Sequence, residues 1–278
     1  MSLRTLAAPL ALAAWRATGP LRANPPGAVR ILILHDVPEA QFAALADLIA
    51  VLQRSAGLIT PGQAEARLAG GAPADGKAPV LLSFDDGFRS NFRLTREILD
   101  PLGVKALFFV CPALVDMAPE DRRAAIGANI FRGRRGADGL DLMDWEQLKG
   151  LAASGHEIGC HSARHVSLVG LEAGELEDEV GIAKTRMAAV LGQTSPWFAF
   201  PFGDVANIDR TALGIIGRHF PLCRSGVRGL AHAGSHPLAL PAESVDLGAP
   251  PALRLLAAEG GMAPLYRGRL RRLEEMAS

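Results

Sequence analysis

Short apolar runs alternate with longer segments of helical periodicity along most of this 278-residue chain. Such runs predict buried strands, and the segments between them predict helices. The expected strands lie at 30–34, 57–60, 79–84, 104–110, 157–160, 197–200, 221–224 and 237–240, with helices at 42–52, 61–68, 90–99, 142–154, 172–191, 208–216 and from 252 onward. Repeated strand–helix units require a parallel sheet covered by helices. About seven or eight of them favour a closed α/β barrel over an open sheet.

Composition supports this reading and excludes other classes of protein. Hydrophobic residues make up 49% of the chain, enough for a large core. The 29 basic and 29 acidic side chains give a formal net charge of zero, which argues against nucleic acid or an anionic membrane bound mainly through phosphate charge. Three cysteines do not make a disulfide framework. Because no run of eighteen apolar residues occurs, we expect no membrane span.

The two ends of the chain are expected to lie outside the barrel. Residues 1–29 form a helical or targeting segment, 30–248 the barrel and 249–278 a helical tail. Arg4 and the apolar residues after it resemble the start of a secretion signal, but Pro9 interrupts the run. This favours a short helix that ends near Gly19 and Pro20, and a cytoplasmic protein over an exported one. The sequence leaves the oligomeric state open.

A pair of acidic residues follows one buried strand. Asp85 and Asp86 come directly after residues 79–84, at the strand end where α/β barrels place their chemistry. Successive strand residues point in opposite directions, so one carboxylate can bind a metal while the other takes up a proton. Asp86–Gly87 is also a common turn dipeptide, and the pair alone leaves a simple turn open.

Two histidines follow another strand. His161 and His165 have the i, i+4 spacing that puts both rings on one face of a helical turn. Two histidines and one carboxylate make a three-ligand site typical of a catalytic divalent metal: zinc, with cobalt, nickel or iron as alternatives. Cys160 is expected to be a packed thiol. His156 stands one residue too far from His161 for a zinc-protease helix and is interpreted as structural.

Two further strand ends carry polar or turn-forming residues. His35 and Asp36 close the first apolar strand, where the histidine could equally cap a turn. Residues 200–204, with Pro201 and Gly203, predict a tight turn that could expose backbone N–H groups.

At these residues the sequence resembles the polysaccharide deacetylases, the NodB-homology family also called carbohydrate esterase family four. Residues 83–87 resemble the first family motif, 161–165 match its His-Ser-x-x-His motif, and 200–203 are similar to the third. The resemblance implies a distorted NodB-type (β/α) barrel. It also implies one divalent metal ion on Asp86, His161 and His165, with Asp85 as general base and the backbone N–H of Phe202 as oxyanion donor.

The sequence departs from the family pattern in two places. The last motif, Leu-x-His, normally lies near the C-terminus, but its best match here is 33–35 near the N-terminus. The resemblance then implies a circularly permuted member in which His35 is the general acid; the alternative is that His232 or His236 supplies the acid. The third motif also lacks the arginine that orients the catalytic aspartate, and nothing in 197–200 replaces it.

Three functions are candidates for this chain. The first is a metal-dependent hydrolase that removes N-acetyl groups from an amino-sugar polymer, oligosaccharide or glycoconjugate. The second is a deformylase or amidase of the same fold that acts on another C–N amide. The third, a non-catalytic sugar-binding relative, predicts the loss of a base, an acid or a ligand, and none is missing. The irregular, arginine-rich segment 112–139 is interpreted as an insertion, either with a short helix of its own or, the favoured alternative, as a solvated loop. Substrate selectivity is expected to reside in loops such as this one.

Overall fold

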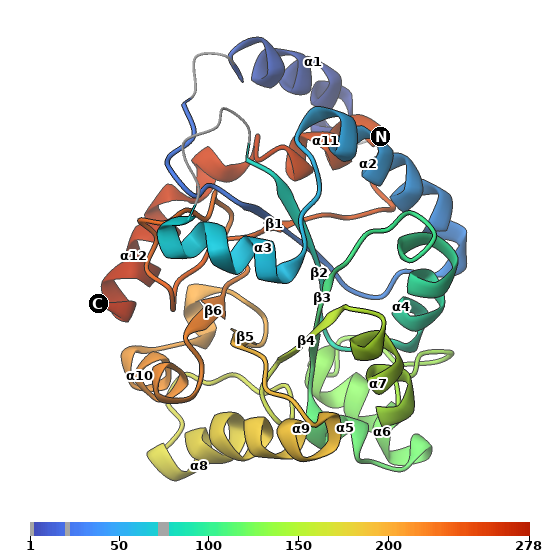
Figure 1. Ribbon diagram of the computed structural model, residues 1–278, viewed down its shortest axis with the longest axis vertical. Coiled ribbons are helices and arrows are strands. Elements are labelled where there is room, and N and C mark those ends of the chain that lie inside the picture. The colour runs from blue at the N-terminus through green and yellow to red at the C-terminus, as the bar shows by residue number, and fades with distance from the viewer. Residues whose placement is uncertain (1–2, 20–22, 72–77) are drawn as a thin grey trace.

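The computed structural model describes residues 3–19, 23–71 and 78–278. Seven parallel strands form one sheet that curls into the predicted distorted barrel, with helices around it (Figure 1). The two edge strands of the sheet do not pair with each other, so the sheet forms a half-barrel and not the closed barrel that the number of strands favoured. The strand order is β6-β5-β4-β3-β2-β1-β7. The strands are β1 (Arg30–Leu34), β2 (Val80–Phe84), β3 (Leu107–Val110), β4 (Glu157–Cys160), β5 (Trp197–Ala199), β6 (Leu222–Arg224) and β7 (Glu243–Ser244).

Helices and short helical turns connect the strands. The α-helices are α1 (Leu3–Ala17), α2 (Phe42–Ser55), α3 (Pro61–Ala66), α4 (Arg89–Leu94), α5 (Pro112–Val115), α6 (Pro119–Ala125), α7 (Trp145–Ala153), α8 (Ala173–Glu177), α9 (Ala183–Leu191), α10 (Arg210–His219), α11 (Pro251–Ala258) and α12 (Arg267–Ala277). The turns are η2 (Glu39–Gln41), η3 (Arg67–Gly71), η4 (Thr95–Leu99), η5 (Ile126–Ile130), η6 (Asp178–Ile182), η7 (Val205–Asn207) and η8 (Ala263–Tyr266).

Alternation along the strands divides the core into two layers. In β1, Ile31 and Ile33 belong to a buried cluster with Leu81 and Phe109, whereas Leu32 and Leu34 pack in the layer between sheet and helices. This is the period of two that a strand buried on both faces requires. Ala64 of α3 joins the inner cluster. The parallel register therefore brings the carboxyl ends of the strands to one end of the barrel.

The first and last helices pack against the barrel units. Trp15 Nε1 donates a hydrogen bond to the carbonyl of Glu259, and Arg16 forms an ion pair with the Glu259 carboxylate, which holds α1 beside α11 (Figure 1). Helix α12 contacts α10. The expected helix at 1–29 is therefore present as α1, whereas its predicted end near Pro20 lies outside the described residues. The described helices are all too short or too polar to span a bilayer.

Two predicted strands are wrong in detail. Residues 57–60 form no strand and contribute one isolated bridge, from Leu58 to Val80. In the stretch 237–240 only Leu240 pairs, with Arg224, and the last strand β7 begins three residues later at Glu243. Both segments were identified from very short apolar runs, in which periodicity gives little information.

The segment 112–139 is not the solvated loop that the sequence favoured. It contains α5, α6 and η5, and these cover a small core of their own: Phe88, Cys111, Leu114, Ile126, Ile130, Ala137 and Leu142. Arg122 is buried beneath it and donates to the carbonyls of Val115 and Met117. The insertion is therefore a folded part of the protein that lies beside the open end of the barrel.

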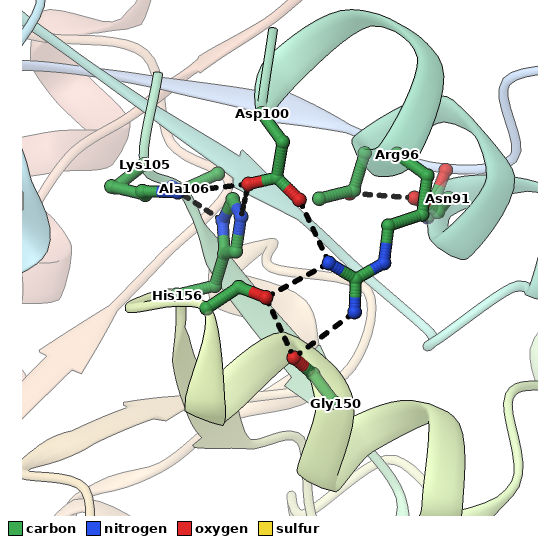
Figure 2. Close-up of polar contacts among 9 residues, drawn as sticks. Asn91, Arg96, Asp100, Lys105, Ala106, Gly150 and His156 are labelled. Atoms are coloured by element: carbon green, nitrogen blue, oxygen red, sulfur yellow. Dashed lines mark hydrogen bonds and ion pairs between the residues drawn. The ribbon is translucent and has the colours of Figure 1, made fainter. Parts of the chain in front are cut away.

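His156 has the structural role that the sequence assigned to it. Its side chain is fully buried; Nδ1 accepts a hydrogen bond from the backbone N–H of Ala106 at 3.1 Å, and Nε2 lies 3.1 Å from Asp100 (Figure 2). Lys105 and Arg96 also bond to Asp100. An acceptor at Nδ1 requires the neutral ring with its proton on Nε2. His156 therefore ties the start of β3 to the start of β4 only while it is uncharged.

We expect His156 to make stability fall in mild acid. Burial lowers the pKa of His156, and the hydrogen bond that its ring donates to Asp100 opposes this shift only in part. Below the unfolded value of about 6.5, the unfolded chain therefore binds a proton that the folded chain excludes. The contribution of His156 to the free energy of unfolding is complete above about pH 6.5. Below that pH the free energy of unfolding decreases, by at most about 1.4 kcal/mol per pH unit. Urea unfolding between pH 7.5 and 5 measures this, and His156→Gln should remove the extra slope. The same slope in His156→Gln as in the wild type would contradict this role; His232→Gln, outside the network, is the control.

Candidate active site

One cavity of about 520 Å³ opens at the carboxyl ends of the strands. Every strand except β3 contributes a lining residue at or shortly after its carboxyl end. These residues are His35 after β1, Asp85 and Asp86 after β2, His161 after β4, Phe202 three residues beyond β5, Arg224 at the end of β6 and Ser244 at the end of β7. The insertion adds Ile130, Phe131 and Arg135. The cavity therefore lies where barrel enzymes carry their chemistry, and four of the six strand ends were identified from the sequence.

Asp86, His161 and His165 converge in this cavity. All three are buried, and one potential ligand atom of each lies within 4.8 Å of the others. His165 Nε2 is 3.1 Å and His161 Nε2 is 3.5 Å from Asp86 Oδ1. His161 Nδ1 lies 2.7 Å from the carbonyl oxygen of Ala199, so Nδ1 carries the proton and the Nε2 lone pair faces the cluster. The donor set and this tautomer fit a divalent metal ion.

The histidines converge without the helical turn that the sequence predicted. Residues 161–168 are irregular, and Ser162 and His165 have φ of 63° and 58°. The loop is fixed instead by Glu179, whose carboxylate accepts from the backbone and side chain of Arg164 and whose carbonyl accepts from Ala163. The two rings nonetheless meet edge to face with centroids 4.9 Å apart.

Backbone strain gathers at the same place. Among the described residues, five other than glycine have a left-handed φ: Asp86, Arg132, Ser162, His165 and Phe202. This conformation is disfavoured for any residue with a Cβ and persists where the surroundings enforce it. Two of the five are candidate ligands, and a third is the candidate oxyanion donor.

Asp86 is held as a carboxylate. Burial alone would raise the pKa of Asp86, but the neighbouring imidazoles of His165 and His161 outweigh burial and hold that pKa well below its usual range. The charged form is the one that binds a metal ion.

Asp85 has a partner that the sequence did not reveal. Arg224, at the end of β6, is buried and donates from Nη2 to Asp85 Oδ1. Its guanidinium carbon also lies 4.7 Å from the centroid of the Phe109 ring. This contact orients the Asp85 carboxylate and balances its charge. Arg224 therefore supplies Asp85 with an arginine contact from the end of β6, whereas 197–200 holds no arginine.

His35, not His232 or His236, lines the cavity beside both aspartates. Asp36 also lines it and accepts a hydrogen bond of 2.6 Å from the hydroxyl of Ser90. The role of His35 and the circular permutation behind it stay predictions.

Phe202 forms another part of the cavity wall. Its ring meets His165 edge to face, with centroids 4.6 Å apart. Within the described part of the chain, no acceptor takes its backbone N–H. The Gly203 carbonyl after it accepts from Gly226, which fixes the turn.

The three cysteines are buried, and none belongs to the cluster of candidate ligands among the described residues. Burial raises the pKa of the Cys160 thiol, and burial together with the charge of Asp86 raises that of Cys111. Cys160 therefore stays a protonated core residue at neutral pH, as the sequence indicated.

The sequence profile of the polysaccharide deacetylase family matches residues 72–218, more than half of the chain. The chain belongs to the polysaccharide deacetylase family. The family is one of hydrolases that act on carbon–nitrogen bonds other than peptide bonds, which is the predicted enzyme class. A chitin deacetylase of Pestalotiopsis sp is 26% identical over 142 residues, 50% of this chain. The matched part spans only 39% of that relative's length.

Solved structures share the fold. IcaB from Ammonifex degensii superposes with a TM-score of 0.65 and 24% identity, covering 84% of this chain and 97% of that one. The BpsB deacetylase domain from Bordetella bronchiseptica gives a TM-score of 0.63 and 19% identity, with 80% and 98% covered. For the deacetylase PplD from Streptococcus pyogenes the TM-score is 0.62 and the identity 19%, with 84% and 100% covered. These likenesses confirm the NodB-type barrel.

Proposed function

We propose that this protein is a metal-dependent deacetylase that removes N-acetyl groups from an amino-sugar polymer, oligosaccharide or glycoconjugate. The observation that carries the proposal is the pairing, in one cavity, of a buried Asp-His-His cluster with a second aspartate held by an arginine. The first suits a divalent metal ion and the second a base of fixed orientation. The chitin deacetylase relative supports an N-acetylated sugar as the substrate.

Asp86, His161 and His165 would hold the ion. When bound, a divalent ion of the zinc type acidifies a water molecule and polarises a carbonyl oxygen. Asp85 is not a member of this ligand cluster, although its Oδ2 lies 4.0 Å from His161 Nε2, and it would accept the proton of the attacking water while Arg224 holds its carboxylate. The N–H of Phe202 would donate to the oxyanion that develops on the amide oxygen. His35 would protonate the departing amine, because an amide nitrogen leaves poorly otherwise.

The test is hydrolysis by the purified protein of defined N-acetylglucosamine oligosaccharides, followed by release of acetate and appearance of a free amine. Chelation should abolish the reaction, and added zinc, cobalt, nickel or iron identifies the ions that restore it. N-formylated oligosaccharides and small cyclic amides run in parallel. Faster hydrolysis of either would favour the formamide or amide alternative, and binding without hydrolysis would favour a sugar-binding relative.

We expect His35→Ala to lower kcat by about 10²-fold, the lower end of general acid–base contributions, with metal content unchanged. The reason is that His35 is the cavity histidine outside the candidate ligand cluster. His232→Ala and His236→Ala are matched controls, because both residues lie outside the cavity lining. If one of these two variants lost activity and His35→Ala did not, the general acid would be His232 or His236, and the permutation would be contradicted.

A further inference from the structure

Two arginines of one short turn lie over two aromatic rings of the cavity wall. The guanidinium carbon of Arg132 is 3.4 Å from the Phe202 ring centroid, and that of Arg135 is 3.7 Å from the Phe131 ring centroid. Phe131 and Phe202 both line the cavity, and so does Arg135 itself. We call Arg132 and Arg135 the cationic rim.

Each ring under the rim rests on a residue close to the reacting centre. Phe131 stacks on Phe88, which is buried two residues after Asp86, with centroids 6.3 Å apart and an interplanar angle of 16°. Phe202 meets the ring of His165. The rim is therefore supported from the core, which lowers the entropy lost when a guanidinium binds a ligand.

The backbone of the turn is held in place as well. Gly133 N–H donates to the Gly127 carbonyl, Arg134 N–H to the Phe131 carbonyl, and Arg132 Nη2 to Asn207 Oδ1. Arg132 is the one left-handed non-glycine residue in the described chain that lies outside the three family motifs, with φ of 53°. Its disfavoured backbone points to the same active-site constraint that acts on Asp86 and Phe202.

Neither arginine of the cationic rim has a carboxylate partner among the described residues, nor does Arg134 between them, whereas Arg224, the other arginine of the cavity lining, pairs with Asp85. Among the described residues, no acidic side chain lies within 4.0 Å of Arg132 or Arg135, whereas neighbouring arginines pair as Arg89–Asp141, Arg122–Asp141, Arg164–Glu179 and Arg224–Asp85. The cavity carboxylates are engaged elsewhere: Asp85 with Arg224, Asp86 with the histidines and Asp36 with Ser90.

We infer that the cationic rim selects glycans that carry an anionic group, a carboxylate or a phosphate, next to the N-acetylated sugar, with Arg135 as the residue that contacts the anion. The inference rests on the proposed function and deepens it. A planar guanidinium presents two parallel N–H donors to a carboxylate or phosphate, and stacking on Phe131 leaves the edge with these donors exposed. A uronic acid or a phosphorylated sugar supplies such a group, whereas chitin does not.

The test compares three N-acetylated oligosaccharides of equal length: one neutral, one alternating with glucuronic acid and one phosphorylated. The wild-type protein should hydrolyse at least one anionic oligosaccharide with a kcat/KM about fivefold above the neutral one, since one exposed ion pair contributes up to about fivefold. Added salt should remove this preference. The arm with the higher ratio distinguishes carboxylate from phosphate. Equal values on all three would overturn the inference.

Arg135→Gln should reduce the preference to about one by raising KM for the anionic oligosaccharides. Arg134→Gln is the matched control, because it removes the same charge from the same turn and Arg134 does not line the cavity. An equal effect of the two variants would mean that the preference depends only on the positive charge of the turn, and would overturn the role of Arg135. If the wild type hydrolyses none of the three, the proposed function fails. The inference is then decided by equilibrium binding of fluorescently labelled oligosaccharides to the wild type and Arg135→Gln, with weaker anion binding by the variant as support and equal binding as refutation.

Discussion

Replacing His161 with alanine is expected to remove the divalent metal ion and to lower turnover by about 10³-fold or more, since Lewis-acid stabilisation contributes several kcal/mol. The reason is the position of its Nε2, which lies 3.5 Å from Asp86 Oδ1 while Nδ1 is committed to the Ala199 carbonyl. Without it, a buried carboxylate and a single histidine remain, fewer than the three protein ligands of ordinary catalytic sites. Elemental analysis and kcat on the N-acetylated oligosaccharide are the measurements.

His219→Ala is the control for that experiment, because His219 pairs with Glu177 far from the cavity lining. It should keep its metal and its activity. Circular dichroism and a thermal melt of both variants separate loss of metal from loss of fold. Metal content in His161→Ala equal to that of the wild type would show that the ion binds elsewhere and would overturn the ligand assignment.

The sequence predicted the barrel because its strands are buried on both faces and therefore stand out as continuous apolar runs. Residues 30–34, 79–84 and 157–160 were placed within a residue or so of β1, β2 and β4. The strands at the edges of the sheet were harder to predict from the sequence. Strand β7 has two residues, one of them the fully buried Glu243, whose carboxylate pairs with Arg228. A charged residue that is buried through tertiary pairing gives no strand pattern in the sequence.

In the candidate site, too, the residues within short sequence motifs were predicted, whereas the contacts between segments far apart in the sequence were not. Asp85, Asp86, His161 and His165 were found because each lies directly after a strand, within a short motif. The helical turn expected for the two histidines was wrong, because the loop is held by Glu179, fourteen residues beyond His165, a contact that no local spacing encodes. The insertion 112–139 was misjudged because its charged surface masks a buried row of apolar residues.

Arg224 was the residue that sequence reasoning missed. It lies 139 residues from Asp85 along the chain. The prediction sought an arginine in the third motif, where the family places it, and so overlooked one that ends the next strand. The signal for it in the sequence is its place at the end of a predicted buried run, because a charged residue there requires a partner.

Asp85→Asn is expected to keep the metal and the fold and to lower kcat by about 10³-fold, within the range of general base catalysis. The amide preserves the shape of the side chain but cannot take the proton of the attacking water. Asp36→Asn is the matched control: it makes the same change at a second cavity aspartate, which is bonded to Ser90, and should leave kcat within a few-fold of the wild type. Near-normal turnover of Asp85→Asn would exclude Asp85 as the base.

Arg224→Met tests whether Arg224 acts by positioning Asp85. If it does, replacing Arg224 should have no further effect once Asp85 has been replaced. Alone, Arg224→Met should lower kcat about tenfold or more, since it leaves the buried Asp85 carboxylate without the guanidinium that orients it. In the double variant Asp85→Asn/Arg224→Met, kcat should equal that of Asp85→Asn, which is the non-additivity expected of residues that act as a unit. Metal content should stay constant across all three variants. Additive losses would instead mean that Arg224 contacts the substrate independently of Asp85, and would remove the proposed positioning role.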